Sequence, residues 1–419
     1  MTGKLESTSL RRELVQQLRG LGLLADPRVA DAFLAVPRER FVPEAAERDG
    51  LQAVYANNPI ATRWDAHGMP TSSSSQPSIM AAMLERLGLH PGHRVLEIGA
   101  GTGYNAALLA ALVGPAGSVV SVEIDPETAS RTRAALQAAG SRVQVVVGDG
   151  RGGWPQAAPY DRMIVTASSA GVPRAWFDQL RPGGRLVLPL QVSLAVDGVQ
   201  VVCVLDKERA GFAPAGAIRG GFMPLRPRAD ALCPLPPALA VSEQLDGTGR
   251  GRMLSQLSGA ALTTMSELAR RRLLALTLGP TRVRRLGRLP RYPLQLFVAL
   301  AARDDRLITH FGPEMANLGI IDRRGRGLAL LGGSDQTVSR VLAYGEPPPQ
   351  AMLVSLVQEW RTLGRPAEDR LGIGVRYGTR AGGHHWRTAR RDDAILAIDW
   401  ATAPLGRRTA ASGSRVDNT

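Results

Sequence analysis

The chain has 419 residues, of which 44% are hydrophobic, so it is long enough for two domains and can bury a sizeable core. Its only two cysteines, Cys203 and Cys233, lack metal-motif spacing, which argues against a disulfide framework and a zinc site. We therefore expect no metal centre. No run of about 18 apolar residues occurs, so we also expect no membrane span and a cytoplasmic location.

Positive charge is concentrated in the second half of the chain. Residues 1–227 contain 23 Lys and Arg against 20 Asp and Glu, whereas residues 228–419 contain 28 against 17. A basic half predicts a polyanionic partner, either a nucleic acid or an acidic peptide. Part of the arginine content is also explained by codon bias, because 49 of the 51 basic residues are arginine.

The first half of the chain has the pattern of an α/β domain. Two helices are expected within 8–37, a connector at 38–43, an irregular stretch at 51–75, and a helix over IMAAMLERLGL. Further on, we expect buried strands at 94–99, 118–124, 143–149, 162–167, 185–190 and 199–206, and helices at 104–113, 126–140 and 173–180. Strands that alternate with helices predict a doubly wound parallel sheet covered on both faces.

The second half has a different pattern. The Pro-rich segment ADALCPLPPALA indicates a boundary, so we expect a first domain at 1–227, a smaller mixed α+β domain at 228–405 and a disordered tail at 406–419. Within the second domain, helices are expected at 253–278 and 349–363, and strand-like segments at 292–301, 326–332 and 394–400.

A glycine-rich turn follows the first buried strand, in the sequence VLEIGAGTGY (95–104). Glu97 stands two positions before the first of three alternating glycines, Gly99, Gly101 and Gly103. Glycines permit a tight turn and let a ligand lie against the backbone. The pattern differs from the G-x-G-x-x-G of dinucleotide sites and suits S-adenosylmethionine, whose amino acid part is a zwitterion rather than a pyrophosphate.

Two more acidic residues end the next two strands. Glu123 can accept hydrogen bonds from both ribose hydroxyls, and Asp149, beside Gly150 in the sequence GDG, can accept from an adenine amino group. The carboxyl ends of parallel strands form the ligand-binding edge of an open α/β sheet. Together with the glycine-rich turn, these residues predict a site for S-adenosylmethionine.

Several segments around this site are distinctive: VPRERFVPE (36–44), SQPSIMAAMLERL after a run of serines, GDGRGGW followed by PYDRMIVTASSAGVPRAW, and FMPL (222–225). With the glycine-rich turn, they resemble protein-L-isoaspartate O-methyltransferases over about residues 12–227. The resemblance implies transfer of a methyl group from S-adenosylmethionine to a peptide carboxylate. It also implies that Ser75 is the active-site serine and that Ser74, Gln76 and Asn57 lie at the substrate.

The chemistry is consistent with a serine that has no partner histidine. A carboxylic acid with a pKa of about 4 is already an anion at neutral pH, so no base is needed to make the nucleophile. The enzyme must orient one carboxylate oxygen toward the methyl group and exclude water, which neutral donors such as the Ser75 hydroxyl can do.

The sequence departs from this family around the substrate. YANNP (55–59) has Asn57 where the family has Asp, the stretch from Pro59 to Ser75 is longer, and a basic extension follows FMPL. Extended relatives in clusters for lanthipeptides and graspetides methylate an aspartate whose ester closes to a succinimide (aspartimide). We therefore expect tailoring of an acidic, ribosomally made precursor peptide in preference to general repair of isoaspartyl proteins.

Two other classes of function are considered. A nucleic-acid-binding module is suggested by RRR (270–272) and RVRRLGRLPR (282–291), although aromatic residues that could stack on bases are sparse there. A methyltransferase for small molecules is disfavoured by the SQP segment and the GDG…GW run.

Overall fold

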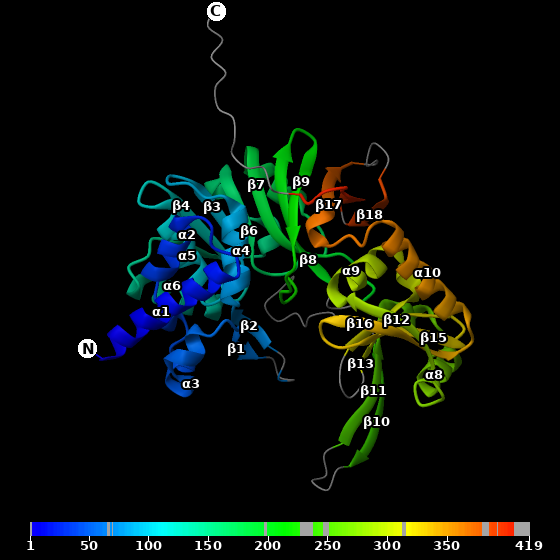
Figure 1. Cartoon of the computed structure of the whole chain (residues 1–419). Coiled ribbons are helices and arrows are strands. Elements are labelled where there is room, and N and C mark those ends of the chain that lie inside the picture. Colours follow the sequence, from blue (N-terminus) through cyan, green and yellow to red (C-terminus); the bar gives the residue numbers. More distant parts are fainter. Residues whose placement is uncertain are drawn as a thin grey trace, which may run out of the picture.

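A computed structural model describes residues 2–64, 68, 70–196, 199–226, 238–245, 251–311, 316–378, 385–391 and 393–405. This part of the chain contains a ten-stranded sheet, a seven-stranded sheet and a two-stranded hairpin (Figure 1). No helix within it is long and apolar enough to cross a membrane. The expected tail at 406–419 and most of the expected boundary segment lie outside the described residues.

The amino-terminal segment is helical and covers the first domain. Its elements are α1 (Thr2–Gly20), α2 (Pro27–Ala35), a 3-10 turn (Arg38–Phe41) and α3 (Pro43–Tyr55). The Asp26 carboxylate accepts from the backbone N–H of Arg28 and so caps α2. Leu14, Leu18 and Phe33 are buried in the same apolar cluster as α4 and α5. The two helices expected within 8–37 are confirmed, whereas α3 was not predicted.

The first half of the chain contains the parallel sheet that the sequence predicts. Its strands are β3 (Arg94–Ile98), β4 (Ser118–Glu123), β5 (Gln144–Val147), β6 (Tyr160–Val165) and β7 (Leu180–Gln191), in the spatial order β7-β6-β3-β4-β5. Helix α4 (Pro77–Leu87) precedes β3, and the helices between the strands are α5 (Tyr104–Val113), α6 (Pro126–Ala138) and α7 (Arg174–Gln179). The chain runs outward from β3 in one direction and then in the other, so β3 lies at the topological switch point where such sheets bind ligands.

Five antiparallel strands, of which three come from near the end of the chain, extend this same sheet. Strands β8 (Gln200–Glu208) and β9 (Gly211–Ile218) continue it in antiparallel fashion. Strand β17 (Leu371–Tyr377) then pairs with β9, followed by β19 (Ala394–Trp400) and β18 (Arg387–Arg391). The hydrogen-bonded sheet therefore runs across the expected boundary at residue 227, and the division of the chain there stays a prediction.

The remaining residues form the second sheet and its helices. The strands are β10 (Ala238–Leu245), β11 (Gly251–Ser258), β13 (Leu307–Phe311), β14 (Ala316–Ile321), β15 (Gly327–Gly333), β16 (Thr337–Gly345) and β12 (Arg282–Pro290), in that spatial order. The helices are α8 (Glu267–Leu276), α9 (Arg291–Ala301) and α10 (Pro348–Thr362).

Two expectations for this part are wrong. The helix expected at 253–278 begins as strand β11, because its first residues pair with β10 and β13. The strand-like segment at 292–301 is helix α9, whose continuous buried run Leu296–Leu300 cannot be told from a buried strand by its pattern alone. The expected elements at 349–363, 326–332 and 394–400 correspond to α10, β15 and β19.

The expectation of an irregular stretch at 51–75 is wrong, because its first residues belong to α3 and most of the rest forms a hairpin. Strand β1 (Ile60–Trp64) pairs antiparallel with β2 (Pro70–Ser74), so three of the four consecutive serines are strand residues. In Figure 1 this hairpin projects below the first domain, on the side that faces the second sheet.

Candidate active site

A large cavity, with a volume of about 1950 Å3, lies at the carboxyl ends of β3 and β4. One wall is formed by the turn after β3, the end of β4 and Gly150. The opposite wall is formed by the β1–β2 hairpin, the serine segment, residues 218–226 and Tyr292 of α9. We call these the cofactor wall and the acceptor wall.

The glycine-rich turn forms the part of the cofactor wall that directly follows β3. Gly99 and Gly101 line the cavity and have φ values of 96° and 52°, which only glycine adopts without strain. A Cβ on Gly99 would lie 2.6 Å from Oγ1 of Thr166, which donates to the Gly99 carbonyl at 2.6 Å. Gly103 does not line the cavity; with φ of 89° it is the residue before α5.

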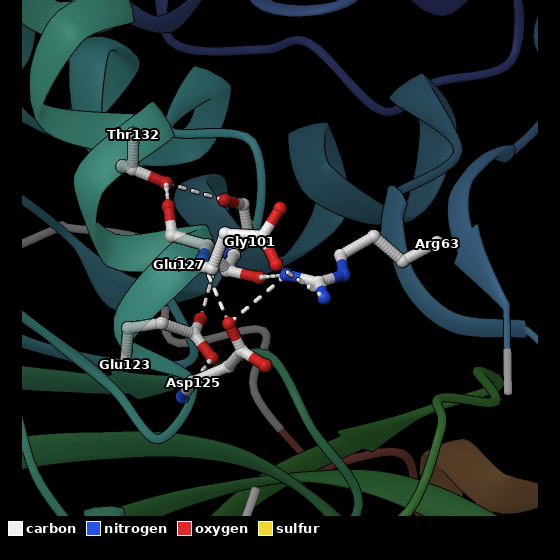
Figure 2. Close-up of polar contacts among 7 residues, drawn as sticks. Arg63, Gly101, Glu123, Asp125, Glu127 and Thr132 are labelled. Atoms are coloured by element: carbon white, nitrogen blue, oxygen red, sulfur yellow. Dashed lines mark hydrogen bonds and ion pairs between the residues drawn. The ribbon is translucent and has the colours of Figure 1, made fainter.

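Glu123 is the carboxylate of the cofactor wall (Figure 2). Its two oxygens accept from the backbone N–H groups of Gly101, at 3.0 Å, and of Asp125, at 3.2 Å. The side chain is buried and still lines the cavity, and burial raises the pKa of its carboxyl group. Since each oxygen keeps a free lone pair, Glu123 can accept two hydroxyl groups of a ligand.

Glu97 lies behind the turn and does not line the cavity. Its oxygens accept from Ser121 Oγ at 2.5 Å and from Asn105 Nδ2 at 2.7 Å. Burial raises the pKa of Glu97 to about 7, against the smaller opposing effect of these hydrogen bonds. Any influence of Glu97 on a ligand therefore passes through the strand and helix that it holds together.

Asp149 and Gly150 are adjacent in the sequence but differ in their position relative to the cavity. Gly150 lines the cavity, and a Cβ there would lie 2.3 Å from Cγ2 of Ile98. Asp149 is not part of the lining; its carboxylate pairs with Arg151 at 2.6 Å, and the hydrogen bonds from Arg151 keep its pKa below the usual value despite an opposing burial effect. The structure thus brings Gly150, but not the Asp149 side chain, to the cavity.

The serine segment lies against the glycine-rich turn. Ser75 lines the cavity, between β2 and α4. The Ser73 carbonyl lies 3.4 Å from the place that a Cβ on Gly101 would occupy, so the two segments are in close contact. Ser74 is buried, and its hydroxyl accepts from Nε of Arg38 at 3.3 Å.

Arg38 holds this segment in place and was missed by sequence reasoning. Its side chain is fully buried, and its guanidinium donates to carbonyls of Val54 at 2.8 Å, Ser75 at 3.0 Å and Asn58 at 3.2 Å. Burial lowers the pKa of this group. Buried charges are costly unless satisfied, and carbonyl oxygens here take the place of a carboxylate partner. The only sequence signal is a charged residue within a short connector, which is weak.

Gln76 and Asn57 fasten the start of α4. Gln76 Nε2 donates to the Asn57 carbonyl at 2.8 Å, and Asn57 Oδ1 accepts from the backbone N–H of Ser78 at 2.9 Å. Gln76 precedes α4 but makes no capping bond with its own side chain, so Asn57 supplies the cap from another part of the chain. Gln76 lines the cavity and Asn57 does not.

Arg63 links the hairpin to the cofactor wall, as Figure 2 shows. Its guanidinium donates to Asp125 at 3.0 Å, to Thr128 at 3.1 Å and to Glu127 at 2.9 Å. These three residues form the amino-terminal end of α6 and the residue before it. The hairpin is therefore fastened over the end of β4, a contact that no motif in the sequence predicts.

The far side of the acceptor wall comes from both halves of the chain. The guanidinium of Arg219 lies 4.8 Å from the ring centroid of Tyr292, whose hydroxyl donates to the Gln200 carbonyl at 2.6 Å. The Gln200 side chain in turn donates to and accepts from the backbone of Phe222. The wall thus presents a cation supported by an aromatic ring, a combination that suits an anionic ligand.

Comparisons with known proteins agree with this geometry. Residues 9–226 match the family described as Protein-L-isoaspartate(D-aspartate) O-methyltransferase. The chain is 39% identical over 216 residues to the protein-L-isoaspartate O-methyltransferase of Ignicoccus hospitalis, which covers 51% of this chain and 96% of that protein. It is 44% identical over 182 residues to that of Methanopyrus kandleri, which covers 43% and 76%.

A solved structure named protein-L-isoaspartate O-methyltransferase extends the likeness beyond residue 226. It aligns with 94% of this chain and 100% of its own chain, with a TM-score of 0.52 and 24% identity, so it shows the shared fold alone. The family match covers more than half of the chain and includes both walls of the cavity up to residue 226. The chain therefore belongs to the protein-L-isoaspartate(D-aspartate) O-methyltransferase family and is an S-adenosylmethionine-dependent O-methyltransferase.

Proposed function

We propose that this chain methylates the free carboxylate of an isoaspartyl residue in a peptide or protein, and that Ser75 orients this carboxylate. The observation that carries the proposal is the contact between the serine segment and the glycine-rich turn, which places Ser75 and Gly101 in one cavity. An acceptor held at Ser75 then lies beside a cofactor held at Gly99, Gly101 and Glu123.

The residues of the cofactor wall bind different parts of the cofactor. Glu123 accepts the ribose hydroxyls, because it is the carboxylate that lines this wall with lone pairs free. Gly99 and Gly101 let the methionine part lie against the backbone, and Gly150 leaves room for the adenine. Glu97 and Gly103 act by holding the turn in shape, whereas the contact of Asp149 with the adenine stays a prediction, because its carboxylate pairs with Arg151.

The reaction needs orientation more than acid–base chemistry. Bound S-adenosylmethionine supplies a methyl group on a positively charged sulfur. A carboxylate oxygen of the acceptor attacks the methyl carbon while the carbon–sulfur bond breaks and its electron pair stays on sulfur, so no proton is transferred. The Ser75 hydroxyl donates to the second carboxylate oxygen and fixes the angle of attack. Ser74, Gln76 and Asn57 hold the segment that presents Ser75.

Replacing Ser75 tests this assignment. We expect Ser75→Ala to lower kcat/KM for a linear isoaspartyl peptide by about 10- to 100-fold, because one positioned neutral donor is lost, while cofactor affinity changes by less than about twofold. Transfer of labelled methyl groups measures the first and isothermal titration calorimetry the second. Ser118→Ala, at an exposed serine where β4 begins and away from the cavity, is the matched control and keeps most of the activity. Loss of cofactor binding in Ser75→Ala would place Ser75 on the wrong wall.

Tailoring of a modified ribosomal peptide is the second candidate. The observation that favours it is that Tyr292, from beyond the matched residues, completes the acceptor wall beside Arg219. The extension alone does not favour it, because the solved structure named protein-L-isoaspartate O-methyltransferase shares the fold over most of the chain. Asn57 is also a weak argument for it, since its side chain caps α4.

Intact mass distinguishes the two candidates. The enzyme is incubated with S-adenosylmethionine and either a linear isoaspartyl peptide or a cyclised acidic peptide that contains ordinary aspartate. A methyl ester on the linear peptide alone supports repair of isoaspartyl residues. Methylation of the cyclised peptide, followed by a net loss of water as the ester closes to a succinimide, supports tailoring.

A further inference from the structure

Strand β12 is an exposed, arginine-rich edge of the second sheet. It is the last strand in the spatial order of that sheet, and β16 is its partner there. Of its nine residues, only Leu289 is buried, and Leu286 is half-buried. An edge strand presents backbone N–H and C=O groups that can pair with another chain. The Leu286 carbonyl already accepts from Arg361, so the open stretch is 282–285.

Four arginines on this edge have side chains without a partner in the part of the chain that the structure describes. Arg284, Arg285 and Arg288 lie on β12, and Arg340 lies on β16 directly opposite Arg285. All four are exposed, and none of their side chains forms an ion pair or hydrogen bond with any residue that the structure describes. Like charges directly opposite each other across two strands are destabilising, so this arrangement favours a bound anion.

Several other arginines of the second sheet and its helices have acidic partners. Arg270 and Arg271 pair with Glu267, and Arg303 and Arg323 pair with Asp305. Arg272 and Arg324 are also exposed without a side-chain partner among the described residues, so β12 differs in having its unpaired arginines along one edge strand and the strand beside it.

This edge leads into the active-site cavity. Strand β12 is followed without a break by α9, and Tyr292, the second residue of α9, lines the cavity. Tyr292 is four positions after Arg288, which is at most about 13 Å of extended chain. A peptide bound along β12 could therefore place a neighbouring residue between Tyr292 and Ser75.

We propose that β12 is a docking edge for an acidic segment of the peptide whose carboxylate is methylated, with Arg284, Arg285, Arg288 and Arg340 pairing with its side chains. This rests on the proposed function, because the segment must belong to the acceptor. The acceptor segment adds to β12 as a further strand, a mode in which backbone bonds supply affinity and side chains supply specificity. A nucleic acid fits less well, since β12 itself contains no aromatic residue for base stacking.

The test uses two isoaspartyl peptides that differ only in the flank, which contains glutamates in one and glutamines in the other. We expect the full-length enzyme to have a kcat/KM about tenfold higher for the acidic peptide at low salt, and the preference to shrink at high salt. The triple variant R284S/R285S/R288S should lose this preference and keep the kcat/KM for the glutamine peptide. The matched control R12S/R19S/R142S removes three exposed arginines elsewhere and should keep the preference.

The outcomes separate the two proposals. Equal rates on both peptides, or loss of the preference in the matched control, would overturn the docking edge and leave isoaspartyl methylation standing. Failure to methylate either peptide would overturn the proposed function. Binding of the labelled acidic peptide to the two triple variants, measured by fluorescence anisotropy, would then test the docking edge independently of methylation. Binding of a single-stranded oligonucleotide that R284S/R285S/R288S abolishes, without any peptide preference, would assign the edge to nucleic acid.

Discussion

The cofactor wall and the acceptor wall of the same cavity are built in different ways. The cofactor wall comes from short turns after consecutive parallel strands, and Gly99, Gly101 and Glu123 lie within 25 residues of one another in the sequence. The acceptor wall joins segments that are far apart, from the serine segment to Arg219 and Tyr292. One wall can therefore be recognised as a motif, whereas the other exists only after folding.

The difference has a physical basis. A cofactor common to many enzymes can be held by backbone geometry, which depends on a few glycines and one carboxylate. An acceptor must be matched in shape and charge, and loops supported by remote residues can vary without disturbing the sheet. Arg38 is an example, because it fixes the position of Ser75 from 37 residues away.

The sharpest way to separate the two walls is to remove Arg38. In Arg38→Met the carbonyls of Val54, Asn58 and Ser75 lose their buried donor, so we expect kcat/KM for an isoaspartyl peptide to fall by about 100-fold or more. Cofactor affinity should change by less than about threefold, since among the described residues Arg38 makes no hydrogen bond to Glu123, Gly99 or Gly101, and its contact with this region is with the Tyr104 ring, at 5.9 Å. Steady-state methyl transfer and calorimetry measure the two effects.

Arg40→Met, at an exposed position two residues away, controls for the loss of charge and should behave as the unmodified enzyme. Arg38→Lys keeps the charge without the fork of donors and should retain only part of the activity. An equal loss of cofactor affinity in Arg38→Met would mean that the two walls are not independent.

The cofactor wall is tested by replacing Glu123. Glu123→Ala removes the proposed ribose acceptor and leaves the N–H groups of Gly101 and Asp125 without their partner, so we expect cofactor Kd to rise by about 30- to 100-fold. At saturating cofactor, kcat should change by less than about threefold. Glu123→Gln keeps one accepting oxygen and should show a smaller increase. A fall in kcat with unchanged Kd would contradict the assignment.

The smallest effect is expected at the link between the walls. Arg63 is part-exposed, and exposed ion pairs contribute at most about 1 kcal/mol, so Arg63→Ala should raise cofactor Kd by about two- to fivefold. The effect should shrink in high salt, where the unmodified enzyme approaches the variant. Stopped-flow measurement of cofactor release checks this. Arg48→Ala, which breaks an exposed pair with Asp49, is the control and should have no effect.

The sequence was most informative where structure is local. The doubly wound sheet, the turn at Gly99 and the position of Glu123 follow from alternating strands and glycine spacing, and the structure places them as expected. Glu97 and Asp149 follow the same motifs, but their side chains lie outside the cavity lining. Spacing predicts which strand end a residue occupies, and it does not predict which neighbour its side chain contacts.

Only the tertiary structure decided the rest. The segment 292–301, expected as a strand, is helix α9, and this helix places Tyr292 at the acceptor wall. The tertiary structure also buried Arg38 under the serine segment and joined β17 to β9 across the expected boundary. In each case the cause is a contact between residues distant in the chain. The sequence by itself therefore determined the family, the parallel sheet and the cofactor turn, whereas the acceptor wall depended on packing that no local pattern records.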